Sequence, residues 1–133
     1  MPQPVYAFLP LGAALGLVVA LVVLAMRPRL GRRAWLAPAA LSVAFLTLSV
    51  DVVIKAGPLG FVPEHLHGPW GAQILCDLIL SAGTALALLL PRARAVGMTT
   101  IPWMALIAAT GSIGLLAMTA RCLFLESRAA ETA

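Results

Sequence analysis

Four long apolar runs, separated by short polar segments, are the main feature of this chain. They occupy about residues 5–26, 34–54, 70–90 and 101–124. At about 1.5 Å of rise per residue, a helix of this length extends roughly 30 Å, which is the thickness of the hydrocarbon core of a bilayer. The pattern predicts an all-α protein, an integral membrane four-helix bundle that forms one transmembrane domain over residues 1–133.

The composition agrees with a protein that lies in lipid. Hydrophobic residues make up 62% of the chain and charged residues only 11%, whereas soluble domains carry about 25% charged residues. The formal net charge of +4 could indicate a nucleic-acid partner, but most of the arginines lie in two short loops between the apolar runs. We therefore expect the lipid bilayer, and not nucleic acid, to be the partner of these charges.

The arginines also predict how the helices are oriented. Four of them lie in the segment 27–33 and two in the segment 91–97. Short loops rich in arginine remain on the cytoplasmic side, so both loops are predicted to lie inside and both termini outside. Trp35 and Trp103 then lie at inner interfaces and Trp70 at an outer one, where tryptophan is enriched. The expected location is the plasma membrane, in bacteria the inner membrane, as a multi-pass protein.

Asp77 is the one formally charged residue of the third apolar run. It follows Trp70 by seven residues, which places it roughly 10 Å below the outer interface, where an ionised carboxylate is costly. Gln73 precedes it by four residues and shares its helix face. An acid at this depth predicts either a contact that fixes the helices or a site for a ligand or proton.

Two further residues are expected to join Asp77 in a polar cluster. Asp51 and Arg121 both belong to the predicted outer half of the bundle, and Arg121 is the one cation at a similar depth. We predict an ion pair between Asp77 and Arg121, with Gln73 and Asp51 bonded to it. Asp51 also has a simpler account, because Lys55 follows it by four residues and can form an ion pair on the same helix.

Small residues predict where helices approach one another closely. Gly12 and Gly16 form a small-residue stripe in the first run. In the fourth run, the same character is given by Gly111, Ser112 and Gly114. Glycine and serine allow close helix contacts in membranes, so both groups are predicted to be helix-packing surfaces.

Metal and redox chemistry are not indicated. Glu64, His65 and His67 lie in the one long loop, 56–69, but no fourth ligand follows at a telling spacing, so we expect solvated side chains and no metal. The two cysteines, at positions 76 and 122, lack the Cys-x-x-Cys spacing of a redox pair. We expect no cofactor.

Several short motifs carry a resemblance to a known family. They are Gln73-x-x-x-Asp77-Leu78, Ala93-Arg94-x-x-Gly97, Trp103, Gly111-Ser112-Ile113-Gly114 and Arg121. Over about residues 41–121 the chain resembles a family of small uncharacterised bacterial four-span membrane proteins, classed as a domain of unknown function. Met118 stands where that family has a tyrosine, and Leu89 or Leu90 where an aromatic residue is common. A fainter similarity to plant proteins of neoxanthin formation and to membrane terpenoid cyclases implies isoprenoid chemistry.

Three classes of function are compatible with the sequence. The first expectation is a non-catalytic membrane subunit or assembly factor, whose helices pack on a protein partner or form a homo-oligomer. The alternative is an enzyme or binder that takes a hydrophobic small molecule, an isoprenoid-type lipid, with Asp77 as the acid. The second alternative is a small oligomeric transporter that associates through Gly12 and Gly16. No catalytic residue is assigned.

Overall fold

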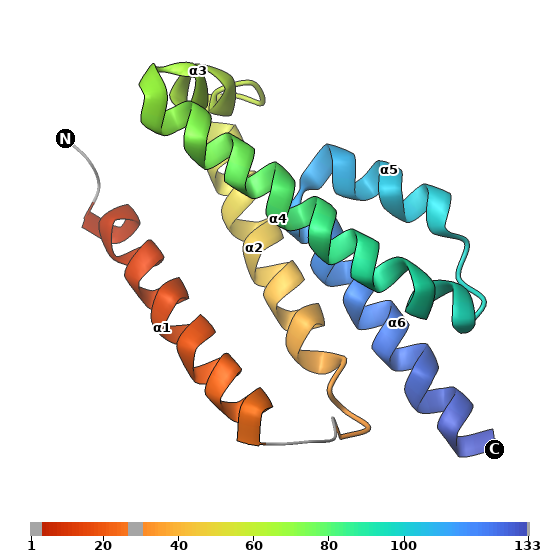
Figure 1. The fold of residues 1–133 in the computed structure, drawn as a ribbon. Helices are drawn as coiled ribbons and strands as arrows, with labels where there is room; N and C mark the ends of the chain where they lie inside the picture. The colour runs from red at the N-terminus through yellow and green to blue at the C-terminus, as the bar shows by residue number, and fades with distance from the viewer. Residues whose placement is uncertain (1–3, 27–30, 133) are drawn as a thin grey trace. The chain divides into compact units, whose positions relative to one another are not determined.

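The structure is a computed structural model that describes residues 4–26 and 31–132. In these residues it is helical and contains no strand, which confirms the predicted all-α class (Figure 1). The six helices are α1 (Pro4–Met26), α2 (Leu36–Ala56), α3 (Phe61–Leu66), α4 (Gly68–Ala95), α5 (Thr100–Thr110) and α6 (Ser112–Thr132).

The chain divides into two compact units, Met1–Gly31 and Arg32–Ala133. The first contains α1, which covers the predicted first span and continues through Pro10. A methyl group added at Gly12 or Gly16 would meet no other atom within 4 Å. The predicted packing role of these two glycines therefore stays a prediction.

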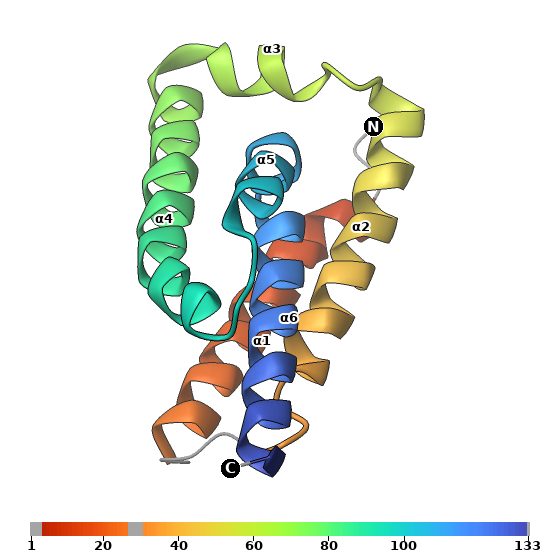
Figure 2. The same ribbon diagram turned by 90° about the vertical axis from the view of Figure 1, so that its right-hand side faces the viewer.

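The second unit is organised around α6. This helix packs against α2, α5 and α4, whereas α2 and α4 make no direct contact with each other in the described residues. Figure 2 shows α6 running between α2 and α4, with α3 joining the ends of those two helices. The buried core is made of residues from α4, α5 and α6: Leu89, Ala93, Ile107, Met118 and Cys122.

The stretch predicted as one fourth span, 101–124, is two helices in the structure. Gly111 has φ +58° and ψ −120°, a conformation that residues with a Cβ rarely adopt, and its N–H donates to Ile107 O at 2.7 Å to end α5. α5 has 11 residues and is about 16 Å long, too short to cross a bilayer. The fourth predicted span is thus an α5–α6 hairpin in the structure, and the expected four-helix membrane bundle is not confirmed.

The hairpin holds α5 and α6 very close together at Gly114. A Cβ on Gly114 would lie 2.9 Å from the backbone N and 3.0 Å from the Cα of Ile107. The N–H of Gly114 donates to Thr110 Oγ1 at 3.0 Å, and Ser42 Oγ of α2 donates to Ile113 O at 3.0 Å. Gly114 therefore lies at a helix contact, whereas Gly111 forms the turn and Ser112 is exposed at the start of α6.

The hairpin also determines at which end of the unit helix α6 finishes. α6 returns toward the end of the unit from which α5 started, so that Arg32 pairs with Glu131 and Arg92 pairs with Glu126. We call this region, which contains residues 32–35, 92–97 and 124–131, the arginine end. The C-terminal helix therefore finishes beside the arginine loops, and not at the opposite end as the unbroken fourth span implied.

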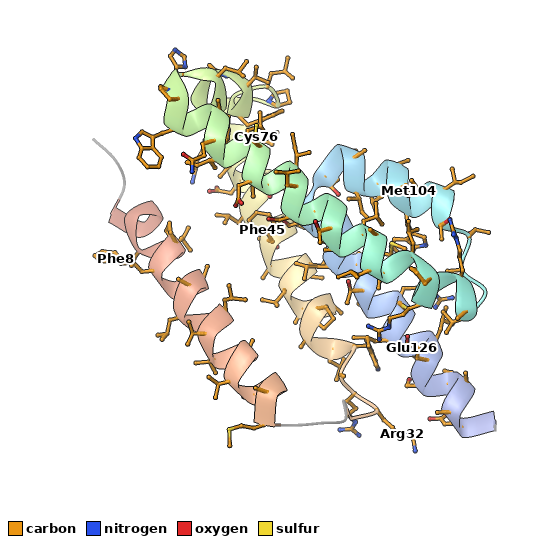
Figure 3. The ribbon with its side chains drawn as sticks, viewed as in Figure 1. Phe8, Arg32, Phe45, Cys76, Met104 and Glu126 are labelled. Atoms are coloured by element: carbon orange, nitrogen blue, oxygen red, sulfur yellow. The ribbon has the colours of Figure 1, made fainter. Side chains whose placement is uncertain are left out.

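Two helices are long and apolar enough to cross a membrane, judged by length and composition in the described residues. They are α2 and α4, each with a mean hydropathy of 2.0 and only 6% of the apolar window buried. Large apolar side chains are exposed on both helices, among them Phe45 on α2 (Figure 3) and Leu80 on α4. This exposure distinguishes α2 and α4 from the core helices of a soluble protein, which bury their apolar residues.

Candidate functional site

The structure does not bring the four predicted cluster residues together. Asp51 Oδ2 accepts from Lys55 Nζ at 2.7 Å, which is the i, i+4 pair that the sequence offered as the simpler account. The Arg121 guanidinium lies 5.8 Å from the ring centroid of Phe124. Asp77 is exposed and forms no ion pair with Arg121 in the part of the chain that the structure describes.

The helix break at Gly111 explains why the predicted ion pair between Asp77 and Arg121 is missing. In an unbroken span that starts at the inner interface, Arg121 would reach the outer side, at the depth of Asp77. In the hairpin, α6 instead travels back toward the arginine end, and Arg121 lies nine residues along it from Ser112. The two side chains are therefore displaced from each other along the unit.

Asp77 belongs to a polar stripe on α4 that the sequence analysis extended only to Gln73. At about 100° per residue, three other polar residues lie within about 40° of Asp77 around the helix axis. We call these four residues the polar stripe: Gln73, Asp77, Ser81 and Thr84, all exposed. The buried residues of α4 that contact α6, Leu89 and Ala93, lie about 120–160° away around the helix axis. The polar stripe thus faces away from the core; its signal in the sequence is the spacing i, i+4, i+8, i+11 from Gln73.

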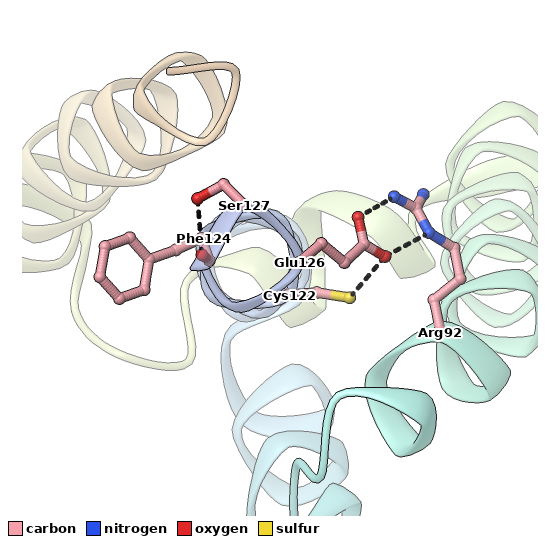
Figure 4. A network of polar contacts seen from close by, with 5 residues as sticks. All are labelled: Arg92, Cys122, Phe124, Glu126 and Ser127. Atoms are coloured by element: carbon pink, nitrogen blue, oxygen red, sulfur yellow. Dashed lines mark hydrogen bonds and ion pairs between the residues drawn. The ribbon is translucent and has the colours of Figure 1, made fainter. Parts of the chain in front are cut away.

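A second polar contact joins α4 to α6 at the arginine end, and Figure 4 shows it. Arg92 donates from Nε to Glu126 Oε1 at 3.0 Å and from Nη2 to Glu126 Oε2 at 2.8 Å. Cys122 Sγ donates to Glu126 Oε1 at 3.6 Å. This geometry is a bidentate guanidinium–carboxylate pair, which fixes orientation as well as contact. Sequence analysis assigned Arg92 only to the loop charge and missed the pair.

Arg92 makes the folded state depend on pH through Glu126. Its guanidinium lowers the pKa of the Glu126 carboxyl below the ordinary value of 4.5, although burial opposes the shift. A carboxyl whose pKa is lower in the folded state stabilises the fold above its unfolded pKa, and this stabilisation is lost as the pH falls through the folded value. The contribution therefore starts to be lost below about pH 4.5 and is lost progressively as the pH falls further.

We expect Glu126→Gln to remove this acid dependence. At pH 7 the variant should lose up to about 1 kcal/mol of unfolding free energy, since the pair is partly exposed. The difference in unfolding free energy between variant and parent should shrink as the pH falls from 7 toward 3. Denaturant unfolding of the purified protein between pH 7 and pH 3 measures both values, with Glu131→Gln as the matched control. A parent whose stability is constant over this range contradicts the prediction.

The third feature is a groove of about 550 Å³ between α6 and the segment that precedes α2, at the arginine end. Its lining residues are Arg32, Arg33, Trp35, Phe124, Ser127, Arg128 and Glu131. The rings of Trp35 and Phe124 meet edge to face, with centroids 5.4 Å apart and planes at 80°. The Arg128 guanidinium lies 5.3 Å from the Phe124 centroid, within the range of a cation–π contact. We call this feature the basic groove.

The long loop gives no metal centre in the described residues. His65 Nδ1 lies 2.8 Å from the carbonyl oxygen of Phe61, and His67 Nδ1 contacts Pro63 O, so each ring nitrogen bonds the backbone of α3. No three side chains that could bind a metal lie together among the residues that the structure describes. The side chain of Glu64 is outside the described part. Part of the predicted long loop, 56–69, is the helix α3 in the structure.

Compared with protein-family models, curated proteins and solved structures, the chain matches none. The resemblance to small bacterial membrane proteins therefore stays a prediction.

Proposed function

We propose that this protein is a non-catalytic membrane subunit, which crosses the bilayer with α2 and α4 and binds a membrane-spanning helix of a partner protein through α4. The observation that carries the proposal is the polar stripe, which is exposed on the side of α4 opposite its core face. A stripe of this kind within a candidate membrane span needs polar neighbours, because lipid provides none.

The placement in the membrane rests on two properties of the helices. α2 and α4 have the length and composition of spans, and their apolar side chains are exposed. Arginine-rich short segments remain in the cytoplasm, so the arginine end is assigned to the cytoplasmic side. The proposed location is the plasma membrane, with the C-terminal end of α6 inside.

Asp77 defines what the partner must offer. It lies nine residues along α4 from Gly68, about 14 Å from the start of the helix. A carboxylate near the centre of a span costs about 2.5–3.5 kcal/mol unless it meets a cation or a hydrogen-bond donor. In this chain α1 contains no charged residue, and the Arg121 guanidinium is at Phe124. We therefore assign the missing group to the partner helix: a lysine, an arginine or an array of polar donors.

A crosslinking experiment in host membranes tests the proposal. A photo-reactive amino acid at Leu80, which is 69% exposed and about 60° from Asp77 around the helix, should give one adduct of constant mass with a different protein. Ile79 is the matched control, because it is 62% exposed but lies about 160° from Asp77. Asp77→Leu should abolish the Leu80 adduct, and Asp77→Asn should retain part of it.

The same experiment separates the other two classes of function. An adduct of Leu80 with a second copy of this chain would replace the subunit proposal with a homo-oligomer, as a small transporter requires. Crosslinking only to lipid, together with a polyene or isoprenoid in the extracted protein, would instead support a lipid-binding role for Asp77. Equal adducts from Leu80 and Ile79 would contradict docking through the polar stripe.

A further inference from the structure

We propose that the basic groove binds the phosphate headgroup of an anionic membrane lipid. Three arginines and one glutamate line the groove, so two positive charges are not balanced within it. Arg32 is paired with Glu131. Arg33 and Arg128 have no carboxylate partner among the described residues. Guanidinium groups bind phosphate through paired N–H donors, which makes a phosphate the ligand that fits this lining.

The aromatic pair keeps one of these arginines in place. The rings of Trp35 and Phe124 meet edge to face, and Arg128 lies over the Phe124 ring. Both rings are held by packed helices: Trp35 directly precedes α2, and Phe124 lies near the middle of α6. A guanidinium held by a ring loses less freedom when it binds a ligand, so the groove is partly organised before the ligand arrives.

The position of the basic groove favours a lipid over a free anion. The groove opens where the apolar helix α2 begins, and Leu36, the first residue of that helix, is exposed. A headgroup in the groove would leave its acyl chains beside the apolar surface of α2, among residues such as Leu41 and Phe45. Anionic lipids are concentrated in the cytoplasmic leaflet, and basic pockets between helices on that side bind such headgroups.

This inference rests on the membrane placement in the proposed function, but not on the docking of a partner. The volume of about 550 Å³ is within the range of small-molecule sites, roughly 300–1,000 Å³. It can therefore hold a phosphate together with a glycerol unit. The lipid class is defined by its phosphate and net negative charge, as in phosphatidylglycerol.

Lipid binding to the purified full chain in nanodiscs tests the inference. Phosphatidylglycerol should bind in preference to phosphatidylcholine, as measured by native mass spectrometry or by exchange of a labelled lipid. Arg33→Gln and Arg128→Gln should each weaken phosphatidylglycerol binding about fivefold, the effect of one basic residue near a membrane surface. Arg94→Gln removes the same charge at the arginine end but outside the basic groove, so it should change binding less than twofold.

Three controls make the outcome decisive. Arg128→Lys retains the charge but not the paired N–H donors, so it should restore part of the affinity, and this partial recovery excludes a loss caused by misfolding. Asp77→Leu should leave lipid binding unchanged, so failure of partner docking is distinguished from failure of this inference. Equal losses in Arg94→Gln and Arg128→Gln would overturn the site, and so would equal binding of the two lipids. Full displacement of the lipid by millimolar inorganic phosphate would assign the groove to a free anion.

Discussion

Gly114→Ala should open the hairpin of α5 and α6 and lower the unfolding free energy by about 1–3 kcal/mol. The added methyl carbon would lie 2.9 Å from the backbone N of Ile107. No rotation of a side chain can relieve that contact, because the atoms it meets include the backbone of α5. The helices must separate, and the core contact of Ile107 with Met118 and Cys122 is then loosened. Unfolding of the purified protein, followed by helical circular dichroism, measures the loss.

Gly83→Ala is the matched control for this substitution. Gly83 is also helical, but a Cβ there would meet nothing within 4 Å. The change should therefore stabilise α4 by about 0.5–1 kcal/mol, the usual gain from glycine to alanine in a helix. Gly111→Ala should resemble Gly114→Ala, because alanine, unlike glycine, is strained at φ +58°, by about 1–3 kcal/mol. Equal stability of the Gly83 and Gly114 variants would mean that the two helices do not pack as described.

The second large effect concerns membrane sidedness. A short tag inserted before Arg32 and a tag placed after residue 132 should report the same compartment, the cytoplasm. A third tag beside Leu59, between α2 and α3, should report the opposite one. The reason is that α6 ends next to Arg32 and Arg92, as the ion pairs with Glu131 and Glu126 require. The readout is protease or label accessibility in intact and opened membrane vesicles.

This experiment has a sharply different outcome for an unbroken fourth span. A continuous helix over 101–124 would carry the C-terminal end to the side of Leu59. The C-terminal tag would then report with Leu59 and against the tag before Arg32. Since each tag is either accessible or protected, the difference is all or none.

The sequence predicts the long helices well because their signal is local. The apolar runs 5–26, 34–54 and 70–90 coincide with α1, α2 and most of α4, and chain length and hydropathy suffice to find them. The break at Gly111 is not local in this sense. Apolar residues continue on both sides of it, and the glycine becomes a turn only because α5 can pack on α6 at Gly114.

The differences between the predicted polar cluster and the contacts in the structure follow from that one break. The predicted ion pair of Asp77 and Arg121 assumed that α6 continues the direction of α5. Because α6 runs in the opposite direction to α5, the Arg121 guanidinium lies over the Phe124 ring. The ion pair that joins α4 to α6 is instead Arg92–Glu126. The charge of Asp77 and its helix face are both local features, so its place on an exposed polar face could be deduced, while its neighbours could not.

The absence of contact between α2 and α4 within the described residues has a consequence for biogenesis. Because α6 is the element that both helices touch, the ribosome must release residues 112–132 before this unit can close. Until then, α2 and α4 would be joined only by α3 and its flanking turns, and in the proposed membrane placement they would lie unpacked in the bilayer. A chain that stops short of α6 would therefore leave α2 and α4 without the helix that joins them.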